Sequence, residues 1–196
     1  MPLSNLIRWG GLVAAIAAAL FIIADLVVVV IALGQGATEG LLFRTAISES
    51  AGVLLALGLV GLYAHQAEAG GYLGLVGFLA AFIALWLGQE NVLWAALLAN
   101  VGWALFGVAS LGAGIYPRVA TILLIVGAVL AGVVNLLLLA IDFGGTAPAS
   151  LVGVGGLIGI IFNVAIVWLG ISLFTGRTEE ARQPTRSRRT DSPPPG

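Results

Sequence analysis

GGLVAAIAAALFIIADLVVVVIAL, residues 10–33, is a run of 24 residues in which Asp25 is the only charged side chain. An α-helix needs about 20 apolar residues to cross the hydrocarbon core of a bilayer. The run therefore predicts a transmembrane helix. Because no polar mature sequence follows it, we expect a retained first helix and not a cleaved signal peptide.

The composition of the whole chain points to the same solvent. Of 196 residues, 60% are hydrophobic and only 9% are charged, whereas a soluble domain carries about 25% charged residues. A chain this apolar lacks the polar residues to cover a water-facing surface, so the lipid bilayer is its expected environment. The length allows one compact membrane domain. The 28 glycines and the absence of lysine favour a GC-rich bacterial genome.

Six stretches are long and apolar enough to cross a membrane, and short polar or turn-like segments separate them. We therefore predict an all-α, polytopic membrane protein with six transmembrane helices in a bundle. The expected transmembrane domain covers residues 1–175, with spans at about 9–33, 47–64, 72–88, 92–114, 119–141 and 151–174.

The arginines predict the orientation of the bundle. Cytoplasmic loops of membrane proteins carry an excess of Lys and Arg, and an even number of spans puts both termini on one side. Arg8 and Arg118 fall on the side of the termini, and Arg44 falls on the other. We expect a plasma (inner) membrane protein with both termini in the cytoplasm. The tail, residues 176–196, is rich in arginine and proline and almost free of apolar residues, which predicts a disordered basic segment.

Polar residues inside the spans are the candidate functional residues. A charged group at the bilayer centre costs about 2.5–3.5 kcal/mol on insertion scales, so each should face protein or water. Helical spacing puts them on stripes of small residues, which let helices approach closely. We predict an intramembrane polar cluster, in part on the outer half of the bundle: Asp25, Glu49, Asn100, Asn135 and Asn163.

Each of these residues also has a structural interpretation. For Asp25 the structural interpretation is a protonated or hydrogen-bonded acid, or one paired with Arg44; the functional alternatives are ion or proton coupling and ligand binding. The asparagines are typical of bridges between helices. Glu49 lies near the interface, where water reaches it, and His65 is expected in a hydrated turn.

Several kinds of chemistry are excluded by residue types. There is no cysteine and no lysine, and there is a single histidine, so thiolate metal sites, disulfides, Schiff bases and multi-histidine sites are not expected. No catalytic motif is present, and we predict no cofactor. A net charge of −1 gives no field to attract nucleic acid.

Two stretches carry a family resemblance: GLYAHQAEAGGYLGLVGFLAA, residues 61–81, and LFGVASLGAGIYPRVATILLIVGAVL, residues 105–130. Both have a glycine late in one helix, a tyrosine in the following turn and a glycine inside the next helix. They resemble uncharacterised bacterial multi-pass membrane proteins of the domain-of-unknown-function family 4386. This resemblance implies a bundle of about six helices and no particular activity.

Three functions remain open. The first is a non-catalytic subunit, sensor or scaffold that acts through helix packing, with a second copy or another membrane protein as partner. The second is a small transporter or channel with an outward-facing polar cavity around Asp25 and Glu49, for which Asp25→Asn should abolish flux and preserve the fold. The third is a membrane enzyme acting on a lipid-like substrate.

Overall fold

The computed structural model describes residues 3–34, 37–87, 92–142 and 148–176. Side chains are not described at residues 3, 32–34, 37–46, 48–49, 92–93 and 142. Helices account for nearly all of the described chain: α1 (Leu3–Gly34), α2 (Ala37–Gln66), α3 (Gly71–Leu87), α4 (Val92–Ala113), α5 (Arg118–Asp142) and α6 (Ala149–Phe174). The expected all-α class is confirmed for these residues.

Four of the helices are long and apolar enough to span a membrane: Ser4–Ile31, Trp94–Ala113, Arg118–Ile141 and Ala149–Phe174. The apolar parts of the other two, Ser50–Gln66 and Gly71–Leu87, are shorter. Two helices begin earlier than the expected spans, α1 at Leu3 and not at 9, and α2 at Ala37 and not at 47. The reason is that hydropathy marks only the lipid-soluble part, while good helix formers such as Glu, Leu and Arg continue the backbone helix beyond it.

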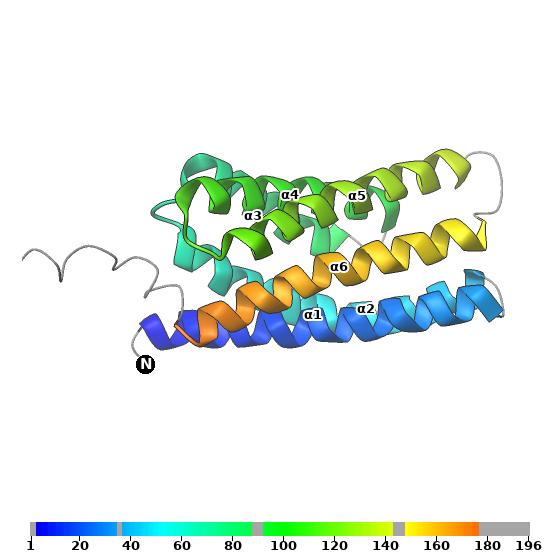
Figure 1. The fold of residues 1–196 in the computed structure, drawn as a ribbon, viewed down its shortest axis with the longest axis horizontal. Coiled ribbons are helices and arrows are strands. Elements are labelled where there is room, and N and C mark those ends of the chain that lie inside the picture. Colours follow the sequence, from blue (N-terminus) through cyan, green and yellow to red (C-terminus); the bar gives the residue numbers. More distant parts are fainter. Residues whose placement is uncertain (1–2, 35–36, 88–91, 143–147, 177–196) are drawn as a thin grey trace, which may run out of the picture.

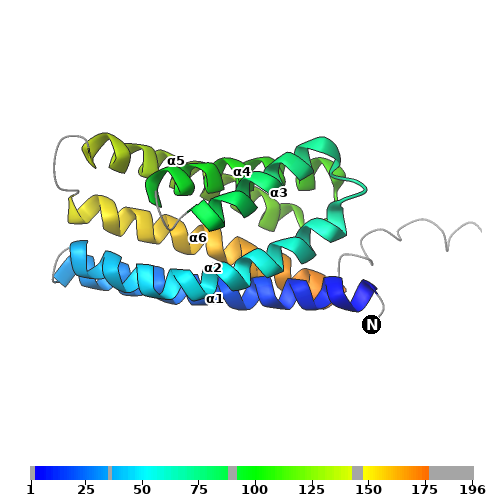
Figure 2. The ribbon, with the colours of Figure 1, turned by 180° about the vertical axis from the view of Figure 1, so that it is seen from behind.

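The helices form two layers (Figure 1). α1 packs against α2 and α6 in one layer, and α4 packs against α3 and α5 in the other. Contacts of α5 with α6, and of α2 with α3, join the layers. Figure 2 shows α2 rising from the first layer toward the second as it approaches α3.

Glycine permits the closest crossings within the first layer. A Cβ on Gly10 of α1 would stand 2.7 Å from the Cα of Gly61 in α2, and a Cβ on Gly11 would stand 2.7 Å from the carbonyl oxygen of Gly170 in α6. Only a residue without a side chain fits at such distances. α1 therefore holds α2 and α6 through backbone contact.

Large apolar side chains are exposed on the outside of every helix. A water-soluble protein rarely exposes such extensive apolar surface, so this surface suits lipid. Examples, one from each helix in order, are Val30, Leu57, Trp86, Trp94, Leu136 and Leu157.

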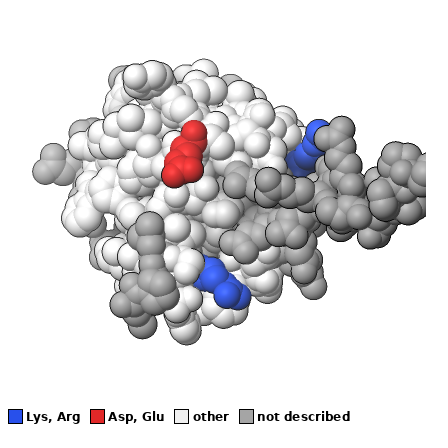
Figure 3. Space-filling model, turned by 90° about the vertical axis from the view of Figure 1, so that its left-hand side faces the viewer, with Lys and Arg blue, Asp and Glu red and all other residues white. Residues whose placement is uncertain are grey.

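Charged side chains of both signs lie apart from one another on the end of the bundle where α1 begins and α6 ends (Figure 3). The helix bounds place three described charged residues at this end: Arg8 near the start of α1, Glu68 between α2 and α3, and Arg118 at the start of α5. Arg8 Nε also donates a hydrogen bond to the carbonyl oxygen of Phe174, at 2.9 Å. We call this face the terminal end. The predicted tail, from Arg177 on, lies outside the described residues.

Candidate functional site: a polar cavity between the layers

A cavity of about 260 Å³ lies between the two layers. All six helices line it, with α2 and α3 contributing Leu55 and Leu85. In α1 and α5 the lining residues belong to the C-terminal half of the helix. In α4 and α6 they belong to the N-terminal half and the middle. Because consecutive helices run in opposite directions, the cavity lies in the half of the bundle remote from the terminal end.

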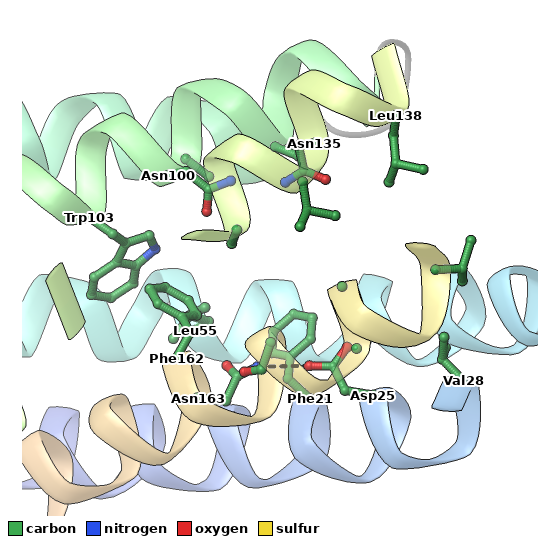
Figure 4. A pocket seen from close by; sticks show the side chains of 18 of the residues that line it. Phe21, Asp25, Val28, Leu55, Asn100, Trp103, Asn135, Leu138, Phe162 and Asn163 are labelled. Carbon is green, nitrogen blue, oxygen red and sulfur yellow. Dashed lines mark hydrogen bonds between the residues drawn. The ribbon is translucent and has the colours of Figure 1, made fainter. Parts of the chain in front are cut away.

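Asp25 of α1 lies in the wall of this cavity on the side of the first layer. Its side chain is 0% exposed. Asn163 of α6 donates a hydrogen bond from Nδ2 to Asp25 Oδ2, at 3.1 Å, and the same Nδ2 contacts the carbonyl oxygen of Gly159, at 2.9 Å. The acid is thus bound to the neighbouring helix, as Figure 4 shows.

Gly159 makes room for the Asp25 carboxyl group. A Cβ at position 159 would stand 2.9 Å from Asp25 Cγ, well inside van der Waals contact. Gly159 and Asn163 are four residues apart, so they lie on the same face of α6. One helix face therefore provides both the space for the acid and its hydrogen-bond donor.

Two asparagines form the opposite wall (Figure 4). Asn100 of α4 and Asn135 of α5 both line the cavity and are half-buried. The Nδ2 of Asn100 is buried and has no hydrogen-bond acceptor among the described residues. An unpaired buried donor costs about 1–3 kcal/mol, so this amide is a polar group left unsatisfied inside the bundle.

Aromatic side chains close the cavity toward the middle of the bundle. Trp103 of α4 and Phe162 of α6 meet edge to face, with their ring centroids 5.7 Å apart. Phe21 of α1 lies in the lining as well. Trp103 is only 2% exposed, so its ring is part of the protein interior. The cavity therefore has an apolar, aromatic end and amide groups on both walls.

Four of the five residues predicted as the polar cluster line this cavity: Asp25, Asn100, Asn135 and Asn163. Glu49 belongs to α2, but its side chain lies outside the described residues, as does that of Arg44, the predicted partner of Asp25. Helical spacing puts Gly156 and Gly159 on one stripe with Asn163, and all three line the cavity. Phe162 was not selected, and the signal for it was its position three residues after Gly159, on the same face.

A second polar cluster lies near the terminal end. Ser110 of α4 donates a hydrogen bond to the side-chain oxygen of Gln66 in α2. Tyr116, between α4 and α5, donates from its hydroxyl to the carbonyl oxygen of Leu62, at 2.8 Å. Both bonds connect the two layers, so they hold the bundle together on the side away from the cavity.

The side chains of this second cluster lie in the protein interior. Gln66, Ser110 and Tyr116 are all buried, and Gln66 Nε2 has no acceptor among the described residues. Burial raises the pKa of the Tyr116 phenol above its usual value. His65 was expected in a hydrated turn, but it lies in the last turn of α2, half-buried, with its ring centroid 5.6 Å from that of Tyr116.

The described residues contain no group of three or more His, Asp or Glu side chains placed to hold a metal ion. Comparisons of the chain with protein-family models, with curated proteins and with solved structures find no match. The resemblance to the domain-of-unknown-function family therefore stays a prediction.

Proposed function

We propose that the protein crosses the plasma membrane six times with both termini in the cytoplasm. The support is the position of the described arginines. Arg8 near the start of α1 and Arg118 at the start of α5 belong to the terminal end, and positive charge is retained on the cytoplasmic side. In this orientation the cavity lies in the outer half of the bundle.

We further propose that the protein binds a small solute in this cavity and transports it. The observation that carries the proposal is the cavity itself, of about 260 Å³, with polar groups on both layers: Asp25 and Asn163 on one, Asn100 and Asn135 on the other. Small-molecule sites are typically apolar hollows with a few convergent polar groups, and those in helix bundles lie between helices. Polar residues inside a membrane that face such a space are typical of substrate pathways.

The distribution of interlayer bonds suggests how access to the cavity could change. Ser110–Gln66 and Tyr116–Leu62 join the layers on the terminal side, and the cavity lies between the layers on the other side. A movement of one layer against the other, about the terminal side, would change access to the cavity. Such a hinge would open the cavity toward the outer side, where a solute would enter.

A non-catalytic subunit or scaffold remains the alternative. The reason to consider a scaffold is that small residues form stripes along the helices, and such stripes suit close contact with a helix of a partner protein. Many of these small residues pack within the chain, as Gly10 does with Gly61, Gly11 with Gly170 and Gly77 with Phe106. These contacts account for the stripes without a partner, so they support the solute-binding proposal more than the scaffold.

Single cysteines test the proposal, because the chain has none of its own. Ala131 lines the cavity, whereas Ala128, on the same helix, is fully buried in the core. In intact cells, a membrane-impermeant maleimide should label Ala131→Cys and should not label Ala128→Cys. Ser150, exposed at the start of α6, is the control for the outer side, and Glu68, exposed on the terminal end, is the control for the cytoplasm.

The outcomes separate the alternatives. Labelling at positions 131 and 150, with labelling at 68 only after permeabilisation, supports an outward-facing, water-accessible cavity. Protection at 131 together with labelling at 150 would overturn the transport proposal and favour a packed scaffold. Labelling at 68 in intact cells would reverse the proposed orientation.

A further inference from the structure

Accessibility separates the polar groups that hold the bundle together from those that a solute can contact. The side chain of Asp25 is 0% exposed and accepts a hydrogen bond from Asn163. The Nδ2 of Asn100 is enclosed as well. Both groups belong to the protein interior, so neither of them can contact a solute in the cavity.

Other polar atoms of the cavity walls are accessible. Among the described residues, Gln66 Nε2 and Asn100 Nδ2 are the enclosed side-chain atoms without a hydrogen-bond partner. The atoms of the lining that have no partner among these residues and are not enclosed are the oxygens of Asn100 and Asn163, both amide atoms of Asn135 and the indole nitrogen of Trp103. Figure 4 shows the oxygen of Asn100 and the nitrogen of Trp103 directed into the space between the layers. The described walls therefore offer a solute three hydrogen-bond acceptors and two donors.

These accessible atoms lie on both layers. Asn163 belongs to α6 in the first layer, and the other three side chains belong to α4 and α5 in the second. A solute with a single polar group would meet only part of this set. A solute with hydroxyl groups at several positions would meet more of it, because each hydroxyl group both donates and accepts hydrogen bonds.

None of the accessible groups on the described walls is charged. Asp25 is the one ionisable side chain among the described lining residues, and it is enclosed. An ion that leaves water is strongly disfavoured unless it contacts an opposite charge. Neither a cation nor an anion finds such a contact on these walls, so they suit an uncharged solute.

We propose that the solute is an uncharged compound with several hydroxyl groups, that is, a polyol. This rests on the proposed solute site and adds the chemical class of its occupant. Asn135 is the side chain that contributes most to recognition, because its amide is accessible both as a donor and as an acceptor.

The test uses probes with a common carbon skeleton: glycerol, propanol, the cation aminopropanediol and the anion glycerate. The purified full chain with Ala131→Cys is placed in lipid nanodiscs. Each probe's dissociation constant is measured from the slowing of cysteine modification by methyl methanethiosulfonate, which does not react with amines. Glycerol should bind about tenfold more tightly than propanol, because its additional hydroxyl groups form further hydrogen bonds, and more tightly than either charged probe.

Two variants test the role of Asn135. In the Asn135→Leu variant, glycerol should bind about tenfold more weakly, since the leucine removes both a donor and an acceptor. Propanol should change little, because its single hydroxyl group can bond to Asn100 or Asn163 instead. Asn5→Leu is the matched control, because Asn5 is exposed at the start of α1, far from the cavity; both affinities should stay as they are. The propanol value also reports whether the Asn135→Leu variant is folded.

The failures are distinguishable. If the cysteine at position 131 is never modified, the solute site itself is overturned. If it is modified but no probe slows the reaction, or a charged probe or propanol slows it as much as glycerol does, the site stands and the polyol class is wrong. Equal effects of Asn135→Leu and Asn5→Leu on glycerol would remove Asn135 from its proposed role.

Discussion

Gly159 of α6 lies directly beside the carboxyl group of Asp25 in α1, at a distance that leaves no space for a methyl group. The same face of α6 carries Asn163, whose amide donates to that carboxyl group. A buried acid is costly unless its oxygens are hydrogen-bonded. The pairing of a glycine with an asparagine one turn later therefore explains how an aspartate is tolerated in the apolar run of α1.

Gly159→Ala should destabilise the bundle. The new methyl group would stand 2.9 Å from Asp25 Cγ and would push the acid away from Asn163. Overpacking of this kind typically costs about 1–3 kcal/mol. Thermal unfolding of the purified protein in detergent measures the loss. Gly153→Ala is the matched control on the same helix, because a Cβ at 153 meets nothing within 4 Å; it should be neutral or slightly stabilising. Equal effects of the two variants would contradict the contact.

Asp25→Asn and Asp25→Leu should differ in stability. The asparagine keeps an oxygen that accepts the Asn163 hydrogen bond, so this variant should unfold close to the parent temperature. The leucine offers no acceptor, and loss of the bond from a buried donor should cost about 1–3 kcal/mol. Unfolding in detergent, followed by circular dichroism, gives both values. A loss in the asparagine variant as large as in the leucine variant would show that the negative charge of Asp25, and not its hydrogen bond, stabilises the bundle.

The sequence predicted the all-helical class because long apolar runs have few alternatives in a bilayer. Each described helix contains one of the predicted apolar runs, and the face of each asparagine that spacing put among small residues, Asn100, Asn135 and Asn163, lines the cavity. The spacing did not reveal that Asp25 is bonded to Asn163, because that contact depends on how α1 and α6 cross. The crossing is set by Gly11 against Gly170, and in a chain with 28 glycines the sequence alone does not show which ones meet.

The second polar cluster was missed for a related reason. Ser110 and Gln66 are 44 positions apart, and neither is unusual for its own helix. Only the approach of α2 to the α4–α5 turn brings them together. Tyr116 was visible as a turn residue, but its burial and its bond to Leu62 depend on the same approach.

Tyr116→Phe should change how stability depends on pH. Burial raises the pKa of Tyr116 in the folded protein above its ordinary value of 10.0. As the pH rises, the unfolded chain therefore loses this proton before the folded chain does. The free energy of unfolding falls as a result. The parent protein should become less stable above about pH 10, and the phenylalanine variant should lose less stability over that range. Denaturation in detergent at pH 8 to 11 compares the two, with Tyr72→Phe as control, since Tyr72 is exposed. Parallel curves for all three proteins would contradict the burial of this hydroxyl group.

Ser110→Ala and the double variant Ser110→Ala with Gln66→Leu should not behave additively. Ser110 is the donor to the Gln66 side-chain oxygen, and Gln66 Nε2 already has no acceptor among the described residues. Ser110→Ala alone leaves a fully buried amide without a side-chain partner, which should cost about 1–3 kcal/mol. Replacing the amide by leucine removes the unpaired groups, so the double variant should recover part of the loss. Unfolding free energies of both single variants and the double variant complete the cycle. A double variant that loses the sum of the single effects would mean that the two side chains do not interact, and that the layers are held together at the terminal end by other contacts.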